Sequence, residues 1–382
     1  MNVLALNCGS ATVKCKLIAI APGARAEAGR VLGSHTEEVR DDDHAGAVGR
    51  ALDGVRAGRG LDAVGHRVVH GGSRFVATTA LDERTVDAIE ALEALAPLHN
   101  RPSVAGMRAC RAALGPRVPM AAVFDTAFHA TLPAHAARYA IAPELADRHG
   151  VRRFGFHGIS YAWATARTAA LLTRPVGALR LVILHLGSGC SAAAIDGGRS
   201  VETSMGLTPL EGLVMRTRAG DVDPALPGFL AGAEGVTIDE VGRWLNERSG
   251  LAGLAGGTGD VRQLLAREAS DPAARVALEV FCHRARKYVG AYLAVLGGAD
   301  ALVFTGGIGE HQPEIRRRIA QAFAWCGLSL DDRRNHDTTA VDGEISADAS
   351  AMRALVVVAD EERMIAAETA ACLASAVPKA RA

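Results

Sequence analysis

Short apolar runs alternate along this chain with stretches in which apolar side chains recur every three or four residues. The first pattern is typical of buried strands and the second of amphipathic helices. Strands are therefore predicted at 3–7, 13–20, 64–70, 121–124, 181–184, 301–304 and 355–358. Helices are predicted over 83–95, from about 273 to 296 and after Asp360, and a charged loop over 37–44. This alternation of strands with helices predicts an α/β fold.

One strand–turn–strand pattern occurs twice. Asn7, Gly9 and Ser10 near the start are matched by His185, Gly187 and Ser188, and the differences 185 − 7, 187 − 9 and 188 − 10 all equal 178. A unit used twice predicts a duplicated domain. The N–H groups and hydroxyls of such turns suit phosphate oxygens. The repeat alone is equally compatible with two ordinary hairpins in one large protein.

Length and composition narrow the class of protein. At 382 residues the chain is long enough for two domains, and it is 49% hydrophobic and 22% charged with a net charge of zero. The balanced charge gives no footprint for nucleic acid, and no apolar run approaches the roughly 20 residues that span a membrane. We expect the basic run 316–318 to be a solvated helix face.

The cysteines and the amino-terminal residues favour the cytoplasm. Seven cysteines are widely spaced, without the pairs of a zinc or redox motif, which favours free thiols in a reducing compartment. The first residues enter a strand without a basic leader, so no signal peptide is predicted. We therefore expect a cytoplasmic protein.

The glycine-rich segments of the chain bear on nucleotide binding. The P-loop pattern G-x-x-x-x-G-K-[ST] does not occur. Gly187-Ser188-Gly189 after a strand mimics a dinucleotide fingerprint, but the sequence soon reaches the hairpin signal 196–198 instead of a crossover helix. We therefore favour a hairpin cradle over a dehydrogenase. The run 306–309 is predicted to form a further glycine loop, open to a ribose or base.

Polar residues with useful chemistry stand at several predicted strand ends: Asn7, Arg67, Asp125, His185 and Glu361. In open α/β sheets, ligands gather outside the carboxyl ends of strands. Oxygen ligands such as Asn, Asp and Glu suit Mg²⁺, and arginines can clamp anions with two hydrogen bonds. Each residue alone is compatible with a structural role. Together they are typical of phosphoryl transfer.

Eight segments, spread in order over nearly the whole chain, resemble motifs of the acetokinase family. They are 6–10, 65–72, 96–100, 123–129, 154–158, 203–212, 217–224 and 304–310. The resemblance implies two duplicated ribonuclease-H-like domains of the actin-like ATPase fold, with an active-site cleft between them. An aperiodic stretch with Pro133 and Pro143 puts the boundary between domains at 1–148 and 149–382, and the C-terminal helix from about 360 is expected to pack back on the first domain.

The resemblance also implies an activity. It predicts a homodimer that uses ATP and Mg²⁺ or Mn²⁺ to transfer the γ-phosphoryl group to acetate or another short-chain carboxylate. It assigns catalysis to Asp125, His157 and Arg218, binding of the acid to Arg67, Val69, Leu98, Phe156 and Pro209, and metal binding to Asn7 and Glu361. It assigns nucleotide binding to Ser10, Thr12, Lys14, His185, Gly187, Ser188, Gly189, Asp260, Arg262, Gly306, Gly307, Gly309 and His311.

The chain departs from the family pattern at a few positions. Ala11 and Thr12 stand where serines are usual, Ser188 replaces an Asn, Arg216 a Gly and Tyr161 a His, and the run 256–259 is atypical. None of these changes removes a main catalytic candidate. The preferred acid stays open among acetate, propionate and butyrate. A non-catalytic, actin-like ATP-binding assembly protein is the remaining alternative.

Overall fold

The computed structural model describes residues 1–9, 11–41, 43–55, 60–93 and 97–376, without the side chains of 97–99 and 376. The chain divides into two compact units. Unit 1 comprises residues 1–130, 156–163 and those from 360 onward, and unit 2 comprises 131–155 and 164–359. Each unit is described by itself.

Unit 1 is built on a six-stranded mixed sheet with the order β3-β2-β1-β4-β6-β5. Its strands are β1 Asn2–Cys8, β2 Thr12–Ala19, β3 Arg30–Glu38, β4 Ala63–Val68, β5 Thr79–Ala80 and β6 Met120–Phe124. β1 pairs with β2 in antiparallel fashion and with β4 in parallel, and β4 is parallel to β6. The predicted hairpin at the start of the chain is therefore confirmed, and it leads directly into the parallel centre of the sheet.

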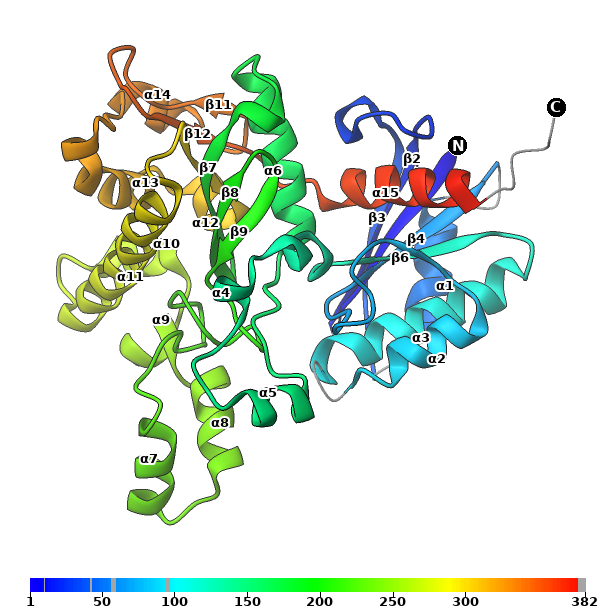
Figure 1. Ribbon diagram of the computed structural model, residues 1–382, viewed down its shortest axis with the longest axis horizontal. Coiled ribbons are helices and arrows are strands. Elements are labelled where there is room, and N and C mark those ends of the chain that lie inside the picture. Colours follow the sequence, from blue (N-terminus) through cyan, green and yellow to red (C-terminus); the bar gives the residue numbers. More distant parts are fainter. Residues whose placement is uncertain (10, 42, 56–59, 94–96, 377–382) are drawn as a thin grey trace. The chain divides into compact units, whose positions relative to one another are not determined.

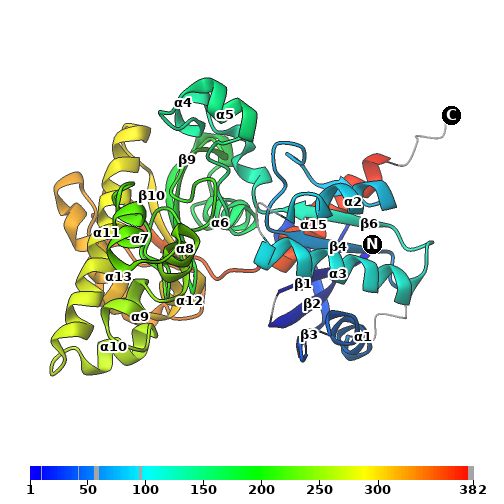
Figure 2. The same cartoon turned by 90° about the horizontal axis from the view of Figure 1, so that it is seen from below.

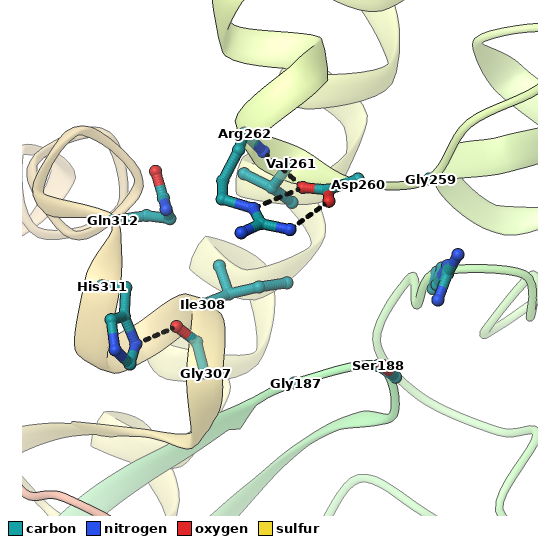
Figure 3. A pocket seen from close by; sticks show the side chains of 11 residues that line it. Gly187, Ser188, Gly259, Asp260, Val261, Arg262, Gly307, Ile308, His311 and Gln312 are labelled. Carbon is teal, nitrogen blue, oxygen red and sulfur yellow. Dashed lines mark hydrogen bonds and ion pairs between the residues drawn. The ribbon is translucent and has the colours of Figure 1, made fainter. Parts of the chain in front are cut away.

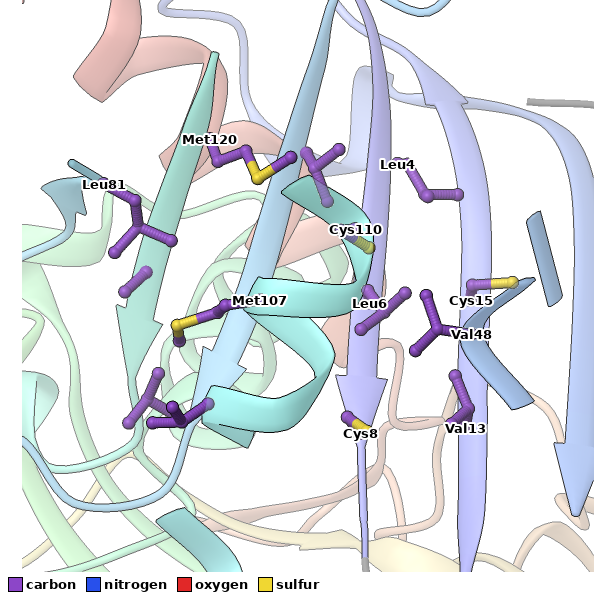
Figure 4. Packing of buried hydrophobic residues seen from close by; sticks show 14 of the residues in the cluster. Leu4, Leu6, Cys8, Val13, Cys15, Val48, Leu81, Met107, Cys110 and Met120 are labelled. Atoms are coloured by element: carbon purple, nitrogen blue, oxygen red, sulfur yellow. The ribbon is translucent and has the colours of Figure 1, made fainter. Parts of the chain in front are cut away.

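Helices cover both faces of this sheet. They are α1 His44–Gly54, α2 Glu83–Glu90, α3 Pro97–Leu114, α15 Glu361–Ala376 and the short η1 Ala26–Ala28 and η3 Ala127–Thr131. α15 runs along one face, against β1, β4 and β6, and α1 to α3 lie together on the other (Figures 1 and 2). Leu4 and Leu6 of β1 meet Met107 and Cys110 of α3 in the main core (Figure 4). Because side chains alternate along a strand, Asn7 falls on the opposite face, which α15 covers.

Unit 2 repeats the same topology. Its sheet order, read as β9-β8-β7-β10-β12-β11, matches that of unit 1 strand for strand and in every parallel or antiparallel pairing. The strands are β7 Arg180–Leu186, β8 Cys190–Asp196, β9 Arg199–Thr203, β10 Ala301–Thr305, β11 Gly343–Glu344 and β12 Arg353–Val356. β7 also begins and ends 178 residues after β1 (180 − 2 and 186 − 8), so the predicted duplication is confirmed.

Most of the helices belong to unit 2. They are α4 Ala134–Ala137, α5 Pro143–His149, α6 Gly158–Leu171, η4 Val176–Ala178, α7 Leu226–Glu234, α8 Ile238–Glu247, α9 Gly250–Leu254, α10 Val261–Arg267, α11 Pro272–Leu296, α12 Gly306–His311, α13 Pro313–Ala320, η5 Gln321–Cys326 and α14 Asp332–Asp337. The first turns of α6, up to residue 163, belong to unit 1. The predicted long helix is α11, which packs against β7 and β8. α7 and α8 form a helical hairpin that projects from the sheet (Figure 1).

Two local predictions were wrong. The run 306–309 is the start of α12 and not an open loop, because Gly306 adopts a φ of 76° that turns the chain from β10 directly into the helix. A Cβ at Gly306 would lie 2.8 Å from the carbonyl oxygen of Leu186, so the position needs glycine. The predicted loop 37–44 also shrinks, since Glu37 and Glu38 extend β3 and α1 begins at His44.

Arg316 corrects the prediction of a solvated basic face. Its side chain is fully buried, and all five of its N–H donors are used. Nε donates to the side-chain oxygen of Asn335, Nη1 to the carbonyls of Gly309 and Glu310, and Nη2 to those of Asn335 and Thr338. Burial lowers the pKa of Arg316 to about 10. This residue therefore fastens the carboxyl end of α12 instead of meeting solvent.

Two further expectations concern the chain as a whole. No described helix combines the length and the apolar character that crossing a membrane requires. All seven cysteines are free thiols. The antiparallel pairing of β7 with β8 makes the turn 187–189 a hairpin, and the antiparallel pairing of β8 with β9 confirms the hairpin predicted at 196–198, which argues against a dinucleotide-binding crossover.

Candidate active site

The polar strand ends of unit 1 meet on the face covered by α15. Leu6 pairs with His66, so the next residues along the two parallel strands, Asn7 and Arg67, lie side by side. A Cβ at Gly65, two residues before Arg67, would collide with side chains of α15, so this alternate position faces that helix. Glu361 is the first residue of α15. The fold therefore gathers residues that are far apart in sequence.

Arg67 is the centre of this cluster. Its Nη2 lies 2.6 Å from Oδ2 of Asp125 and its Nε 3.3 Å from Oδ1, which makes a two-point hydrogen-bonded pair. Nη1 donates to Oδ1 of Asn7 at 3.4 Å, and Nε lies 3.6 Å from Oε2 of Glu361. Of the five guanidinium donors, these hydrogen bonds use three and leave one N–H on each terminal nitrogen. A second carboxylate can bind to that pair.

The two acids differ in their surroundings. Asp125 follows β6, is 1% exposed, and donates its backbone N–H to Val68 at 2.9 Å. Burial raises the pKa of Glu361 to about 6, and the carboxylate of Asp125 adds to this increase while Arg67 opposes it. Lys16 bonds Asp360 and Glu362 at 2.8 and 3.1 Å and so fixes the start of α15 on both sides of Glu361. Burial and ion pairs therefore hold the side chains of this cluster in place.

His157 occupies a strained corner next to Asp125. Its backbone φ is +58°, a value that residues other than glycine rarely adopt. A Cβ at the following residue, Gly158, would collide with the carbonyl oxygen of Asp125. Only glycine permits this close approach, so the backbone of Asp125 fixes where His157 can lie.

His129 fixes the backbone next to His157, through the carbonyl of Phe156. Its Nε2 donates to the carbonyl of Phe156 at 3.0 Å, and burial lowers the pKa of this imidazole to about 4. Tyr161 is fully buried, and its ring centroid lies 5.5 Å from that of His129 in an edge-to-face contact. Tyr161, one of the atypical residues, therefore packs against the histidine that holds the backbone of Phe156.

The remaining candidates of unit 1 are placed only in part. Thr12 and Lys14 lie on β2, and Lys14 pairs with Asn7 across the hairpin. Val69 follows β4 and is half-buried. Ser10 and the side chain of Leu98 lie outside the described residues.

Arg218 of unit 2 carries a charge without a carboxylate partner among the residues that the structure describes. Its Nη1 donates to the carbonyl of Pro209 at 3.0 Å and contacts the sulfur of Met215 at 3.6 Å. Burial lowers the pKa of this guanidinium from its ordinary value. A half-buried cation with only neutral partners is well suited to meet an anion.

A pocket of about 510 Å³ lies in unit 2, where the β7–β8 turn faces the starts of α10 and α12 (Figure 3). Six of the predicted nucleotide residues line it: Gly187, Ser188, Asp260, Arg262, Gly307 and His311. His185, Gly189, Gly306 and Gly309 belong to the same segments but are not among its lining residues. The pocket also includes Val261 and Ile308, which lie within the predicted segments 260–262 and 306–309, and Arg216, Gly259 and Gln312, to which the sequence motifs assign no nucleotide contact.

The turn that forms one wall of the pocket has backbone N–H groups without hydrogen bonds. The N–H groups of Ser188 and Gly189 form no hydrogen bond within the described chain, because the turn is closed by Gly187, whose N–H reaches the carbonyl of Gly189 at 3.1 Å. Opposite them, Asp260 accepts two bonds from the side chain of Arg262, at 3.1 and 2.6 Å. This pairing lowers the pKa of Asp260 to about 2. Backbone donors on one wall and a fixed ion pair on the other suit a phosphorylated, polar ligand.

The oxygen atoms around Arg67 indicate which kind of metal ion could bind there. Among the described residues, no three His, Cys, Asp or Glu side chains converge on one point. The oxygen ligands available in the cluster are one amide, Asn7, and two carboxylates, Asp125 and Glu361. Such a set fits a hard cation that keeps several water ligands, as Mg²⁺ does, and is unsuited to zinc.

Comparison with known proteins places the chain. A model of the acetokinase family matches residues 2–367. The chain belongs to the acetokinase family. Its members are kinases that transfer phosphate to a carboxylate. It is 41% identical to an acetate kinase of Chloroherpeton thalassium, over 98% of this chain and 99% of that protein.

Solved structures of the family agree. An acetate kinase of Porphyromonas gingivalis superposes with a TM-score of 0.89 at 35% identity, over 97% of this chain and 99% of the other. A propionate kinase of Francisella tularensis gives a TM-score of 0.87, also at 35% identity, over 96% and 98%. The fold is thus that of the family, and the overall likeness does not separate the two acids.

Proposed function

We propose that this chain catalyses reversible transfer of the γ-phosphoryl group of ATP to acetate, giving acetyl phosphate and ADP. The observation that carries the proposal is the hydrogen bonding of the Arg67 guanidinium. Its fixed pairing with Asp125 orients the guanidinium and leaves two N–H groups for the substrate carboxylate. An acid of this kind is ionised at neutral pH, so its oxygen can attack phosphorus without a general base. The new bond joins that oxygen to the γ-phosphorus, while the bond to the β-phosphate oxygen breaks and its electron pair leaves with ADP.

The charges of the site answer the main obstacle, which is repulsion between two anions. Arg67 neutralises the acid, and we propose that Arg218 and His157 stabilise the equatorial oxygens of the transferred group in the transition state. Arg218 supports this role because it has no carboxylate partner among the described residues. We propose that Asp125 orients Arg67 and does not remove a proton, and that it would orient a water ligand of Mg²⁺ when the ion is bound.

We further propose that Asn7 and Glu361 hold Mg²⁺, with Mn²⁺ as a substitute. Their oxygens fit this ion, and Lys16 fixes the helix start that carries Glu361. When bound, the ion would offset charge on the β- and γ-phosphates.

The nucleotide is assigned to the pocket of unit 2. We propose that the turn 187–189 binds phosphate oxygens, while Asp260, Arg262 and the segment 306–311 contact the nucleoside, and that His185 supports the turn. Thr12 and Lys14, with Ser10, are proposed as further phosphate contacts. The unused N–H groups of Ser188 and Gly189 support this assignment.

Acetate is the first choice of acid and propionate or butyrate the alternative. We propose that Val69, Leu98, Phe156 and Pro209 line the acyl site. The likeness to a propionate kinase keeps the alternative in place. One methylene changes binding by only about 1–3 kcal/mol, so we expect a preference and not an absolute choice.

An acyl-hydroxamate assay tests the proposal. Enzyme, ATP and Mg²⁺ are incubated with acetate, propionate or butyrate and hydroxylamine, which traps an acyl phosphate. We expect hydroxamate with all three acids and the highest kcat/KM with acetate, and none without acid. A higher kcat/KM with propionate would make propionate, and not acetate, the preferred substrate. Absence of product with every acid, despite ATP binding, would refute the kinase assignment.

Oligomeric state and location complete the proposal. We propose a cytoplasmic homodimer. Two large apolar side chains on the α7–α8 hairpin, Phe229 and Ile238, are 69% and 61% exposed, and such side chains are typical of an interface. Light scattering after size exclusion should give twice the chain mass of 39.7 kDa. A monomer at micromolar concentration would contradict the dimer.

A further inference from the structure

Arg216 lines the unit 2 pocket, although neither the strand-end pattern nor the family motifs assign it a role. Its main chain is fixed on both sides. The N–H donates to the carbonyl of Ser188 at 3.2 Å, and the carbonyl accepts from the N–H of Ala252 at 2.9 Å. The residue is therefore held directly beside the turn in which the N–H groups of Ser188 and Gly189 form no hydrogen bond within the described chain, while its side chain is exposed.

The neighbouring loop leaves room for the side chain of Arg216. A Cβ at Gly259 would lie 2.8 Å from Cγ of Arg216 and 2.5 Å from its carbonyl oxygen, closer than real contacts allow. Two unusual residues of this chain, Arg216 and the glycine before Asp260, thus lie against each other. The backbone of Arg216 bonds the turn at Ser188, and the stem of its side chain lies against Gly259, the residue before Asp260.

The charges of the pocket single out Arg216. Arg262 is committed to Asp260 by three hydrogen bonds, two from its side chain and one from its backbone N–H. His311 is bonded through Nδ1 to the carbonyl of Gly307 at 2.9 Å. The guanidinium of Arg216 has no hydrogen bond or ion pair within the described part of the chain. Counting Arg216 and Arg262 against Asp260 leaves the lining with a net charge of +1, carried by the arginine without a partner.

We propose that Arg216 binds the phosphate chain of the nucleotide and so determines affinity for nucleoside di- and triphosphates. This inference rests on the proposed nucleotide site. A guanidinium can make two parallel hydrogen bonds to phosphate oxygens, and Ser188, whose N–H forms no hydrogen bond within the described chain, lines the same pocket and can share them. Because the contact forms when ADP or ATP binds, Arg216 affects KM and Kd much more than kcat.

The test measures binding by calorimetry with Mg-ADP, Mg-ATP and adenosine. Arg216→Gln should weaken both phosphorylated ligands by about 10- to 100-fold, the range for one bond to a charged group, and leave adenosine within about twofold. Arg216→Lys should recover part of the loss. The KM for ATP should rise by a similar factor with kcat within about threefold. Arg243→Gln, an exposed arginine on α8, is the matched control and should change nothing.

A second variant tests the position of the Arg216 side chain without removing its charge. Gly259→Ala should displace the arginine stem and weaken ADP in the same way, and it should add little in the Arg216→Gln background, because both changes remove one interaction. Normal ADP affinity in Arg216→Gln would overturn the inference, as would an equal loss for adenosine. Failure of the wild-type chain to bind any nucleotide would instead refute the proposed site itself.

Discussion

The pair formed by Arg67 and Asp125 offers the most direct test of the candidate site, because it has structural and catalytic consequences that can be separated. Asp125 is 1% exposed and the side chain of Arg67 is 18% exposed. Removing one partner of a buried pair leaves the other charge uncompensated, which typically costs about 3–5 kcal/mol. Since Arg67 retains some contact with water, we expect Arg67→Ala to lower the free energy of unfolding by about 3 kcal/mol.

A double-mutant cycle isolates the pair itself. Arg67→Ala, Asp125→Ala and the double variant are compared by urea unfolding in EDTA, so that metal binding does not contribute. Two charge-assisted hydrogen bonds predict a coupling energy of about 2 kcal/mol. The exposed pair Arg317–Glu314, with similar distances but side chains 46% and 33% exposed, is the control and should give less than about 1 kcal/mol. Coincident transitions by two probes are required before free energies are compared.

The catalytic arm uses Arg67→Lys. Lysine keeps the charge but cannot bond Asp125 and the acid at once through a planar fork. We expect the KM for acetate to rise at least 10-fold with a smaller change in the KM for ATP. Equal coupling energies for the buried and exposed pairs, together with an unchanged KM for acetate, would refute the reasoning from the geometry of Arg67.

Three further predictions follow from other features. Gly158→Ala should abolish most activity and lower Tm by several degrees, because its Cβ would collide with the carbonyl of Asp125; a variant with normal Tm would contradict this. Arg218→Ala should reduce kcat by roughly 10²–10³ with little change in stability, as expected for one electrostatic stabiliser, and near-normal turnover would remove it from the mechanism. Burial lowers the pKa of His66 to about 3 and of His129 to about 4, below the value near 6.5 in the unfolded chain, so stability should fall as pH drops from about 6.5 toward 4. At pH 5 each should cost about 2 kcal/mol, and His66→Gln should flatten the curve; parallel curves would contradict it.

The sequence was sufficient for features that depend on neighbouring residues. The strands β1, β2 and β7 follow from apolar runs bounded by turn residues, and the constant offset of 178 survives in the structure because no residue is inserted between the matched strands and turns. Strand ends carrying Asn7, Arg67 and Asp125 could be recognised for the same local reason. Their roles in binding and catalysis stay predictions.

Other features depend on contacts that no local pattern encodes. Arg316, within a run of three arginines, is buried because five oxygen acceptors from α12 and the 335–338 segment converge on it. The glycines after β10 form a helix because a single residue, Gly306, makes the turn beside Leu186. The place of Arg216 in the pocket likewise depends on Gly259, more than forty residues away in the chain.

The duplication explains how two equal folds hold different chemistry. Strand register makes His185 the counterpart of Asn7 and Thr305 the counterpart of Arg67, and the same count along the last parallel strand gives Ala359 for Asp125.

Unit 2 therefore lacks the charged cluster at the place where unit 1 has it. Its turn differs as well, because the N–H of Gly187 bonds Gly189, whereas that of Gly9 reaches one residue further, to Thr12. The tighter turn leaves the N–H groups of Ser188 and Gly189 unused. Packing constrains the apolar positions inside the sheets more than it constrains the strand ends, so one topology can carry the proposed acceptor site in unit 1 and the proposed nucleotide site in unit 2.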